Sequence, residues 1–327
     1  TGSGETESLR HGVVVLATGG GEVKPSDYLY GKDARVHTLL EIEGLLEKGG
    51  APEWSSAVLI GCAGSREPGR PYCSRVCCGQ MVNDALKMKE SRPDIDVYVL
   101  YRDIRTYGFS ELLYKKAAEM GIRFVRFDPD DKPVVEAGEA GLKVTVTDRV
   151  LGQKLEIPAD VVGLAVGVAP GTDQERLSRL FKVPLNEDGF FMEAHLKLRP
   201  VESAVDGIFL CGLAHSPKSI EECMAQARAA AAKAATVLSR ERLDAHGVIG
   251  VVDANRCIGC GVCSDICPFD AAILKPTEEG DKAEIISASC KGCGQCAVRC
   301  PQRAISINCF TDEQVESQIA AASGVSE

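Results

Sequence analysis

The sequence has no apolar run that approaches the roughly 20 residues that a membrane-spanning helix needs. Its longest apolar stretch, residues 161–169, has the character of a strand and is interrupted by Gly163 and Gly167. The opening segment, TGSGETESLRHG, is polar and acidic, and it lacks the pattern of a secretory signal peptide. These absences predict a cytoplasmic protein that does not span a membrane.

The sequence also lacks an excess of positive charge. Lys and Arg number 37 against 47 Asp and Glu, which gives a formal net charge of −10. This balance argues against nucleic acid as a partner. No Ser-His-Asp set and no pair of carboxylates stands out. The chain starts without a methionine, so we expect an internal piece of a longer protein, a processed chain or one with residues left by cloning.

The composition is that of an ordinary soluble globular protein. The length of 327 residues is enough for two or three domains. Residues 1–245 alternate short apolar strands with helical patterns, as α/β proteins do. Alternating apolar and polar residues between 128 and 158 predict an excursion of antiparallel strands. Ser219, followed three residues later by Glu222, predicts a capping box. Strands are expected in HGVVVLATGG, AVLIGCAGS, DVYVLYRD, IRFVRF, VVGLAVGV and GIFLCGL, and helices at 38–48, 78–91, 110–120, 174–181 and 220–240.

Cysteine is unusually abundant, with 15 residues. An odd count with repeated Cys-x2-Cys and no secretion signal favours metal-binding thiolates over disulfides. CIGCGVCSDICP and CKGCGQCAVRCP, about 33 residues apart, are two copies of the bacterial ferredoxin run, whose fourth cysteine ligates the other cluster. Zinc modules instead use one or two Cys-x2-Cys pairs. We predict two [4Fe–4S] clusters, one on Cys257, Cys260, Cys263 and Cys300, the other on Cys290, Cys293, Cys296 and Cys267.

A second group of cysteines interrupts a nucleotide-binding pattern. The stretch VLIGCAGSREPGRPYCSRVCCGQM runs from strand to loop to helix but lacks Gly-x-Gly-x-x-Gly. Cys62 stands where the backbone would have to approach a pyrophosphate. Together with Cys73, Cys77 and Cys78 it suits a third [4Fe–4S] cluster at the helix start. Zinc, a redox disulfide and buried unpaired thiols remain as alternatives.

Two further segments, VVVLATGG and GIFLCGLAHSPKSIEECMAQARAAAAKAA, resemble the FAD-binding segments of disulfide-reductase-like flavoproteins. Unrelated strand-to-helix turns are the alternative. The resemblance implies an NAD(P)-type domain inserted between them. The Gly-Asp usual in that family is here Gly212-Leu213, and its N-terminal glycine fingerprint is missing, so FAD retention is expected to need the missing part or a partner chain. The resemblance implies that the cofactor-binding residues are Thr18, Gly19, Gly20, Gly212, His215, Pro217, Lys218 and Ser219.

Other residues near these segments have less specific interpretations. Lys218 would stabilise an anionic reduced flavin or be a solvated lysine at a helix end. His215 would be a flavin or proton contact or a surface histidine. His195 and Arg199 would lie near the flavin ring or be structural. Arg102, Arg105 and Tyr107 are expected at an interface or around the third cluster, and structural thiols are expected at Cys211, Cys223 and Cys309.

The order of these features, with VYVLYRDIRTYG and DGFFMEAHLKLRPVESAVDG between the cysteine loop and the last flavin segment, closely resembles the C-terminal half of the A-type subunit of CoB–CoM heterodisulfide reductases. The resemblance covers residues 11–309. It implies an α/β fold of partial disulfide-reductase-like FAD/NAD(P)-type Rossmann domains, followed by a bacterial 2[4Fe–4S] ferredoxin domain (α+β). The expected segments are FAD-domain residues 1–52, an NAD(P)-like domain at 53–170, a return FAD segment at 171–245, the ferredoxin domain at 246–310 and a tail at 311–327.

The same resemblance implies an oxidoreductase subunit that passes electrons between a donor module, FAD and [4Fe–4S] clusters in flavin-based electron bifurcation. The implied partners are B- and C-type subunits, a hydrogenase- or formate-dehydrogenase-type input module and soluble ferredoxin, in a hetero-oligomer. One alternative is a pure electron-wiring subunit whose flavin site is vestigial or completed by a partner. Another is an NAD(P)H-linked oxidoreductase with a fused ferredoxin, against which Cys62 in the glycine loop argues.

Overall fold

The computed structural model describes residues 8–47, 53–138, 141–241 and 247–324. The chain divides into two compact units, Thr1–Thr236 and Val237–Glu327, and each is described here by itself. Among the described residues, no helix has both the length and the apolar character needed to cross a bilayer.

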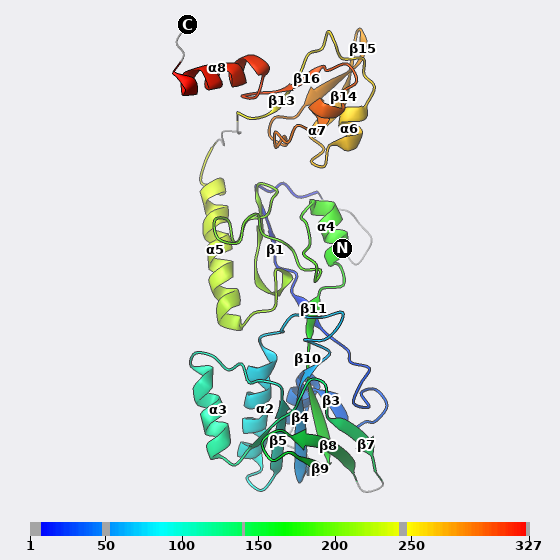
Figure 1. Ribbon diagram of the computed structural model, residues 1–327, viewed down its shortest axis with the longest axis vertical. Helices are drawn as coiled ribbons and strands as arrows, with labels where there is room; N and C mark the ends of the chain where they lie inside the picture. The colour runs from blue at the N-terminus through cyan, green and yellow to red at the C-terminus, as the bar shows by residue number, and fades with distance from the viewer. Residues whose placement is uncertain (1–7, 48–52, 139–140, 242–246, 325–327) are drawn as a thin grey trace. The chain divides into compact units, whose positions relative to one another are not determined.

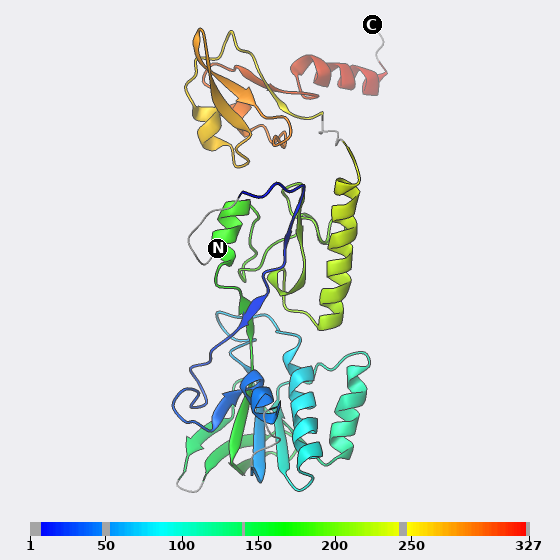
Figure 2. The ribbon, with the colours of Figure 1, turned by 180° about the vertical axis from the view of Figure 1, so that it is seen from behind.

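A five-stranded parallel sheet forms one part of the first unit, in the order β3-β10-β4-β5-β6 (Figures 1 and 2). All six residues of β10 are buried, as expected of a parallel strand that is covered on both faces. The strands are β3 (Val36–Thr38), β4 (Ser56–Ala63), β5 (Asp96–Tyr101), β6 (Arg123–Arg126) and β10 (Val161–Val166).

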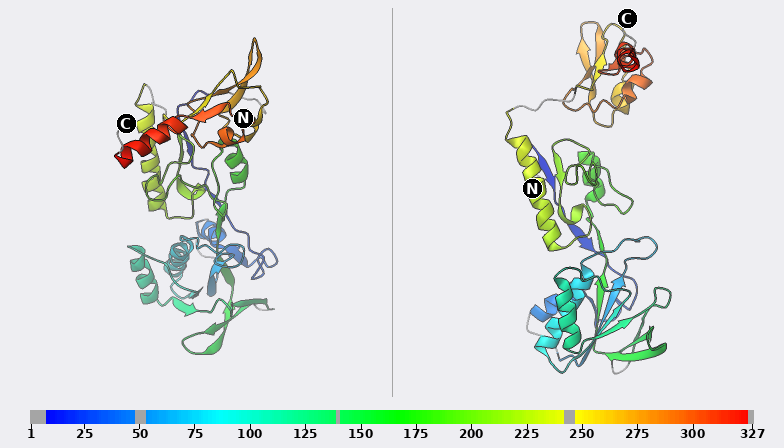
Figure 3. Two further views of the ribbon diagram at one scale, coloured as in Figure 1. Left: turned by 45° about the horizontal axis from the view of Figure 1, so that its top comes forward. Right: turned by 60° about the vertical axis from the view of Figure 1, so that its left-hand side comes forward.

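Different layers cover the two faces of this sheet. Helices α1 (Leu39–Glu47), α2 (Cys77–Ser91) and α3 (Ser110–Glu119) pack on one face. An antiparallel sheet of β7 (Val134–Ala137), β8 (Leu142–Asp148) and β9 (Gln153–Ala159) packs on the other (Figure 3). Gly163 shows how closely α1 approaches β10, because a Cβ there would lie 2.6 Å from Ile42 Cδ1. The antiparallel pairing of β7, β8 and β9 confirms the excursion predicted between residues 128 and 158.

The rest of the first unit is built on a two-stranded parallel pair, β1 (Val14–Leu16) and β12 (Ile208–Leu210). The pair is followed by the short helix η1 (Gly212–Ala214) and by α5 (Ile220–Leu238). Helix α4 (Gln174–Phe181) precedes β12 in the chain. The antiparallel pair β2 (Gly20–Glu22) and β11 (Val168–Pro170) joins this part to the larger sheet. Only Ala230 and Ala234 of α5 are fully buried, and Val15 is 43% exposed. Because parallel sheets normally have both faces covered, this part presents surface that another polypeptide could cover.

The second unit contains two antiparallel pairs, β13 (Gly250–Val252) with β16 (Ile305–Ile307) and β14 (Ala272–Thr277) with β15 (Gly280–Ile285). Helices α6 (Val262–Ile266) and α7 (Gln295–Arg299) each begin after a left-handed glycine, Gly261 and Gly294. The sequence duplication thus reappears as two equivalent halves. The final helix, α8 (Asp312–Ser323), starts with a capping box of Thr311 and Gln314 and buries none of its residues.

The predicted alternation of strands and helices is confirmed. Helix α4 matches the expected range at both ends, and α5 ends at Leu238, two residues before the expected end. The capping box is also confirmed, because Ser219 N–H donates to Glu222 Oε2 at 2.9 Å and Glu222 N–H donates to Ser219 Oγ at 3.3 Å. The three-residue strands β2, β3 and β11 were not expected, since so few residues carry no readable periodicity.

Candidate iron–sulfur and flavin sites

Two cavities lie within the second unit, and four cysteines line each of them. Each cavity takes three cysteines from one ferredoxin run and the last cysteine of the other run. This is the grouping expected for crossed ligation of two clusters. One cavity is lined by Cys257, Cys260, Cys263 and Cys300, and the other by Cys267, Cys290, Cys293 and Cys296.

Backbone amides point at four of these sulfurs in matched pairs. Ala271 N–H donates to Cys267 Sγ at 3.2 Å, and in the other half Ala304 N–H donates to Cys300 Sγ at 3.3 Å. Ala283 and Gly250 donate in the same way to Cys257 and Cys290, at 3.3 Å each. N–H donors to sulfur favour the negative charge of a thiolate-bound cluster. The thiols and their donors therefore fit an iron–sulfur cluster in each cavity.

Two glycines allow the chain to close around the cavities. A Cβ at Gly259 would lie 2.2 Å from the carbonyl oxygen of Asp281, and one at Gly292 would lie 2.6 Å from that of Val248. Both residues also have positive φ, +68° and +62°. Glycine is therefore required in each run for steric as well as conformational reasons. Among the described residues, no three Cys, His, Asp or Glu side chains meet in a geometry that would hold a single metal ion.

The first unit contains a second group of four cysteines, which we call the thiol quartet: Cys62, Cys73, Cys77 and Cys78. Cys62 is the penultimate residue of β4 and has φ +61°, at the point where the register with β10 shifts. Cys77 and Cys78 open α2. The Cys77 thiol hydrogen-bonds Cys78 and interacts electrostatically with Cys62 and Cys73. The left-handed turn, the loop and the helix start therefore place the four thiols close enough to interact electrostatically.

Neighbouring thiols and cations shape the acidity of the quartet. The hydrogen bond from Cys77 lowers the pKa of Cys78 to about 7, while the pKa of Cys77 is raised well above its usual value by the same bond and by burial. The two thiols therefore titrate as a pair, and the first proton leaves more easily than from an ordinary cysteine. Burial raises the pKa of Cys62, and Arg66 and Arg102 partly oppose that rise.

Arginines surround the quartet. Arg66 Nη1 lies 3.9 Å from Cys62 Sγ and is paired with Asp103. Arg105 pairs with the same carboxylate at 3.1 Å, and Arg102 Nη1 donates to the carbonyl of Arg66 at 2.8 Å. The neighbourhood of the quartet is one of the two places expected for Arg102 and Arg105. Arg66 was not expected, although it lies within the cysteine loop and its spacing from Cys62 could have indicated it.

The loop between β4 and α2, which we call the quartet loop, differs in length from a dinucleotide-binding turn. It runs from the end of β4 at Ala63 to the start of α2 at Cys77, whereas βα connections usually have about 2–6 residues. In a Rossmann site the first turn leads directly into the helix whose N-terminus holds the pyrophosphate. Here the long loop folds back through a bridge between Glu67 and Arg70, and cysteines occupy the helix start.

The residues expected at FAD lie at the carboxyl ends of β1 and β12, which are neighbours. Cys211 N–H donates to Leu16 O at 3.1 Å, which brings the segment after β1 alongside the turn after β12. A Cβ on Gly20 would lie 2.8 Å from the carbonyl oxygen of Ala169 and 3.5 Å from Leu213 Cβ. Gly19 has φ +77° and faces open space. The structure thus brings Thr18–Gly20 and the turn from Gly212, which we call the flavin turn (residues 212–219), to one edge.

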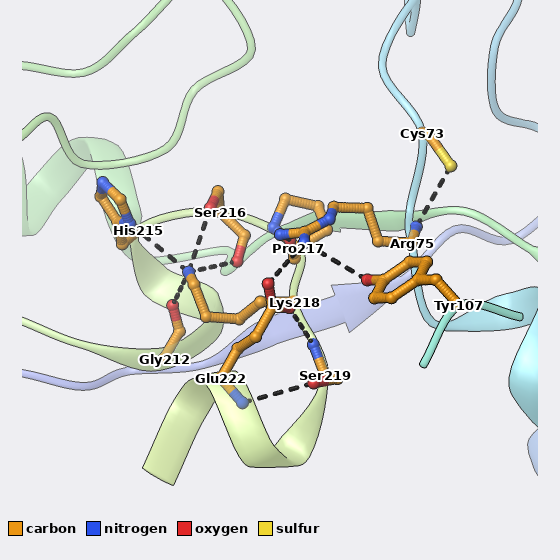
Figure 4. A network of polar contacts seen from close by, with 10 residues as sticks. All are labelled: Cys73, Arg75, Tyr107, Gly212, His215, Ser216, Pro217, Lys218, Ser219 and Glu222. Carbon is orange, nitrogen blue, oxygen red and sulfur yellow. Dashed lines mark hydrogen bonds and ion pairs between the residues drawn. The ribbon is translucent and has the colours of Figure 1, made fainter. Parts of the chain in front are cut away.

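Lys218 is turned inward within the flavin turn. It is 7% exposed, and its Nζ donates at 2.7 Å to the carbonyls of both Gly212 and Ser216 (Figure 4). Burial lowers its pKa. The alternative of a solvated lysine is therefore wrong, and contact with an anionic flavin remains a prediction. The Lys218 ammonium group closes the flavin turn by bridging the carbonyls of Gly212 and Ser216.

His215 belongs to a half-buried polar network and not to the open surface. Gly212 N–H donates to Gln226 Oε1 at 2.9 Å, so the amide NH2 of Gln226 faces His215 Nδ1 at 3.0 Å. Lys218 Nζ also approaches Nδ1, at 3.4 Å. Nδ1 must therefore accept, and Nε2 carries the proton that it donates to Glu193 Oε2 at 2.6 Å. Burial raises the pKa of Glu193, but the bond from His215 and the nearby Lys218 outweigh it and lower the pKa overall.

Among the remaining singled-out residues, His195 and Arg199 have structural partners. His195 Nδ1 accepts from the amides of Lys197 and Leu198 at 3.2 Å each, and Arg199 pairs with Glu202 at 2.8 Å. Cys211 is buried at the end of β12, Cys223 is half-buried, and Cys309 is exposed. Pro217 is buried and offers its carbonyl to Arg75 at 3.3 Å. Arg75, Glu193 and Gln226 were not expected at the site. All three lie within the quoted stretches, but only their contacts in the fold single them out.

Known proteins match this chain over nearly its whole length. A family profile described as a 4Fe–4S dicluster domain matches residues 249–301. The A-type subunit of the H2:CoB–CoM heterodisulfide, ferredoxin reductase of Methanothermobacter thermautotrophicus is 37% identical over 336 residues, which cover 97% of this chain and 50% of that protein. The first of two A-type iron–sulfur subunits of the CoB–CoM heterodisulfide reductase of Methanopyrus kandleri is 37% identical, covering 96% of this chain and 50% of its own length.

The chain belongs to the family of A-type heterodisulfide reductase subunits. It spans about half the length of the curated relatives it matches. Another relative, from Archaeoglobus profundus, is named for its likeness to the A-type subunit of heterodisulfide reductase and is 38% identical over 80% of this chain and 37% of its own length. Among solved structures, Lactococcus lactis thioredoxin reductase covers 70% of this chain and 67% of its own at 18% identity and a TM-score of 0.47, a likeness too distant to bear on function.

Proposed function

We propose that this chain is an iron–sulfur flavoprotein subunit of a heterodisulfide-reductase-like oxidoreductase complex. The observation that carries the proposal is the pair of cavities, each lined by three cysteines of one ferredoxin run and the fourth of the other. Such crossed ligation holds two [4Fe–4S] clusters close together in one small unit. Clusters of this kind accept and release electrons one at a time, and the surrounding amides and apolar side chains set their potentials.

The thiol quartet is proposed to hold a third [4Fe–4S] cluster, on Cys62, Cys73, Cys77 and Cys78. The arginines around it offset the negative charge of such a group, and the quartet occupies the place where an NAD(P)H-binding protein would hold a pyrophosphate. The domain that would exchange a hydride with a nucleotide would then exchange single electrons instead.

The flavin site is proposed to be completed by polypeptide outside this chain. Thr18–Gly20 and the flavin turn would contact FAD at the ends of β1 and β12. Val15 and most of α5 are exposed, and the relatives are about twice as long as this chain. When bound, FAD would supply a carrier that takes two electrons and releases them singly. The chain's own residues would shape the turn, with Lys218 and His215 holding its carbonyls and side chains in place.

The bifurcating role, the B- and C-type subunits, the hydrogenase- or formate-dehydrogenase-type donor and soluble ferredoxin belong to the same proposal. The name of the Methanothermobacter thermautotrophicus relative couples H2, a heterodisulfide and ferredoxin in one reductase. A chain that only wires electrons between partners is the second candidate, and the incomplete cover of β1 and α5 favours it. Cytoplasmic localisation likewise remains part of the proposal.

Mixing with reduced nucleotide separates these functions from the NAD(P)H-linked alternative. Anaerobic addition of NADPH or NADH is expected to leave the visible absorption of the clusters unchanged over minutes, because the quartet replaces the pyrophosphate site. Dithionite serves as the control and is expected to bleach the same absorption. Rapid bleaching by NADPH would contradict the proposal and support a nucleotide-dependent oxidoreductase.

Flavin content tests the partner-completed site. The isolated chain, incubated with excess FAD and passed through a desalting column, is expected to retain well below one FAD per chain. The same measurement on the chain purified with its partner subunits is expected to give about one. Stoichiometric FAD on the isolated chain would contradict completion by another polypeptide.

A further inference from the structure

Arg75 occupies an unusual backbone position inside the thiol quartet. It lies between Cys73 and Cys77 in the chain and has φ +63°, a left-handed conformation that residues with a side chain seldom adopt. In this conformation its backbone N–H donates to Cys73 Sγ at 3.3 Å. Residues kept in such conformations are usually held by the structure around them and mark functional sites. The contacts of the Arg75 side chain show what holds it.

The guanidinium group of Arg75 has three acceptors on two separate segments of the chain (Figure 4). Nη2 donates to Glu222 Oε1 at 2.5 Å and to Tyr107 Oη at 3.3 Å, and Nη1 donates to the carbonyl of Pro217 at 3.3 Å. Pro217 lies in the flavin turn, Glu222 in the first turn of α5, and Tyr107 before α3. A single arginine thus connects the quartet loop with the turn and helix that would face a flavin.

Glu222 makes the connection continuous, because its two oxygens have different partners. Oε1 accepts from Arg75, while Oε2 accepts from the Ser219 N–H at 2.9 Å. The carboxylate that caps α5 is therefore the same one that holds Arg75. A lysine could not reproduce this arrangement, because only the planar guanidinium presents several N–H groups in fixed directions. From Cys73 Sγ the path runs through Arg75 and Glu222 to Ser219 in hydrogen bonds and covalent bonds alone.

We propose that Arg75 is a positioning residue that fixes the thiol quartet relative to the flavin turn. The inference rests on the proposed function, in which the quartet holds a cluster and the turn contacts FAD. The step it serves moves one electron: the flavin is oxidised by one electron, the cluster is reduced by one, and no bond in the chain forms or breaks. The Arg75 side chain contacts Pro217, Tyr107 and Glu222 and acts by holding the supports of the two groups together.

A merely stabilising ion pair is the competing explanation. The side chains of Arg75 and Glu222 are each 39% exposed, and ion pairs at that exposure contribute little to stability. Such a small contribution does not explain a left-handed arginine with three acceptors on two separate segments. The structural explanation predicts that removal of the side chain changes thermal stability slightly and nothing else.

The test uses Arg75→Gly, Glu222→Gln and, as a matched control, Arg70→Gly. Glycine adopts φ +63° readily and keeps the N–H that faces Cys73, so Arg75→Gly removes only the side-chain connection. Glu222→Gln keeps an acceptor for Ser219 and removes the charge that binds Arg75. Arg70 lies in the same loop, but its Nη1 donates within the loop, to Gly64 O at 2.8 Å. Each variant is purified with its partner subunits.

Three quantities are measured: iron per chain, hydrogen–deuterium exchange of the peptide covering residues 217–226, and the rate of electron transfer between flavin and clusters. Arg75→Gly is expected to keep its iron, to exchange about tenfold faster in this peptide and to transfer electrons at least about tenfold more slowly, because small misplacements strongly slow reactions between positioned groups. Glu222→Gln should share the slower transfer, and Arg70→Gly should match the unsubstituted chain.

Unchanged exchange and an unchanged rate in Arg75→Gly, with full iron content, would overturn the positioning role. Loss of about four irons in that variant would also overturn it, because Arg75 would then be needed for the cluster itself. Failure of the proposed function shows elsewhere: an unsubstituted chain with about eight irons lacks the third cluster, whatever the variants do.

Discussion

Replacing Cys300 by serine is expected to remove the cluster held by the other ferredoxin run, with Cys257, Cys260 and Cys263, and to leave the cluster of its own run in place. The cavity lining gives the reason, because Cys300 faces the cavity of the first run. Serine is a poor ligand for iron in such clusters, whose ligands are cysteine thiolates. The chain should lose about four irons per molecule, measured together with acid-labile sulfide under anaerobic conditions.

The reciprocal variant and a thiol control sharpen this result. Cys267→Ser should remove the cluster on Cys290, Cys293 and Cys296, so the two single variants should lose clusters with distinguishable reduction potentials. Cys309 is exposed and lines neither cysteine cavity, so Cys309→Ser should keep all of the iron. Loss of the cluster of its own run from Cys300→Ser would contradict crossed ligation.

Replacing Asp84 by asparagine is expected to stabilise the first unit at neutral and alkaline pH. Asp84 lies on α2 in the helical core with 0% exposure, and no described residue donates a hydrogen bond to either carboxylate oxygen. Burial, with a smaller contribution from Glu43, raises its pKa from 3.8 to about 7. A shift of this size corresponds to roughly 4 kcal/mol of destabilisation once the group is ionised.

The direction of the pH effect follows from the raised pKa. The folded state holds the proton more tightly than the unfolded state, so stability is highest below pH 4 for this group and falls as pH rises to about 7. Asparagine carries no charge at any of these pH values. The melting temperature of Asp84→Asn should therefore exceed that of the unsubstituted chain by about 8–16 °C at pH 8 and by less at pH 5.

The exposed carboxylate Asp130 provides the control for this comparison, since Asp130→Asn should change melting at neither pH. Taking the difference between variant and unsubstituted chain cancels the contributions of the other carboxylates and of the clusters. An equal gain at pH 5 and pH 8, or a loss at both, would contradict an ionised Asp84 as the source of the penalty.

The sequence was most informative where the chemistry depends on spacing. The ferredoxin runs could be grouped into two sets because four thiols at fixed intervals, repeated with the same intervals, leave little other interpretation, and the cavities show the same grouping. Helices such as α4 and the cap at Ser219 were also accessible, because periodicity and capping are local properties. The family followed from the order of these motifs.

The contacts between distant segments were not accessible. Arg75 and Glu222 are 147 positions apart, and the capping box that contains Glu222 does not indicate its contact with Arg75. Asp84 reads in the sequence as an ordinary polar position of a helix, and only the packing of α1 and α3 against α2 buries it. Tertiary contacts decide both.

Iron and acid-labile sulfide per chain, measured on anaerobically purified protein, test most directly the claim that each set of four cysteines holds a four-iron cluster. We predict about twelve irons: eight in the second unit and four on Cys62, Cys73, Cys77 and Cys78. About eight would contradict the third cluster and leave the thiol quartet as a zinc site, a thiol switch or a structural feature.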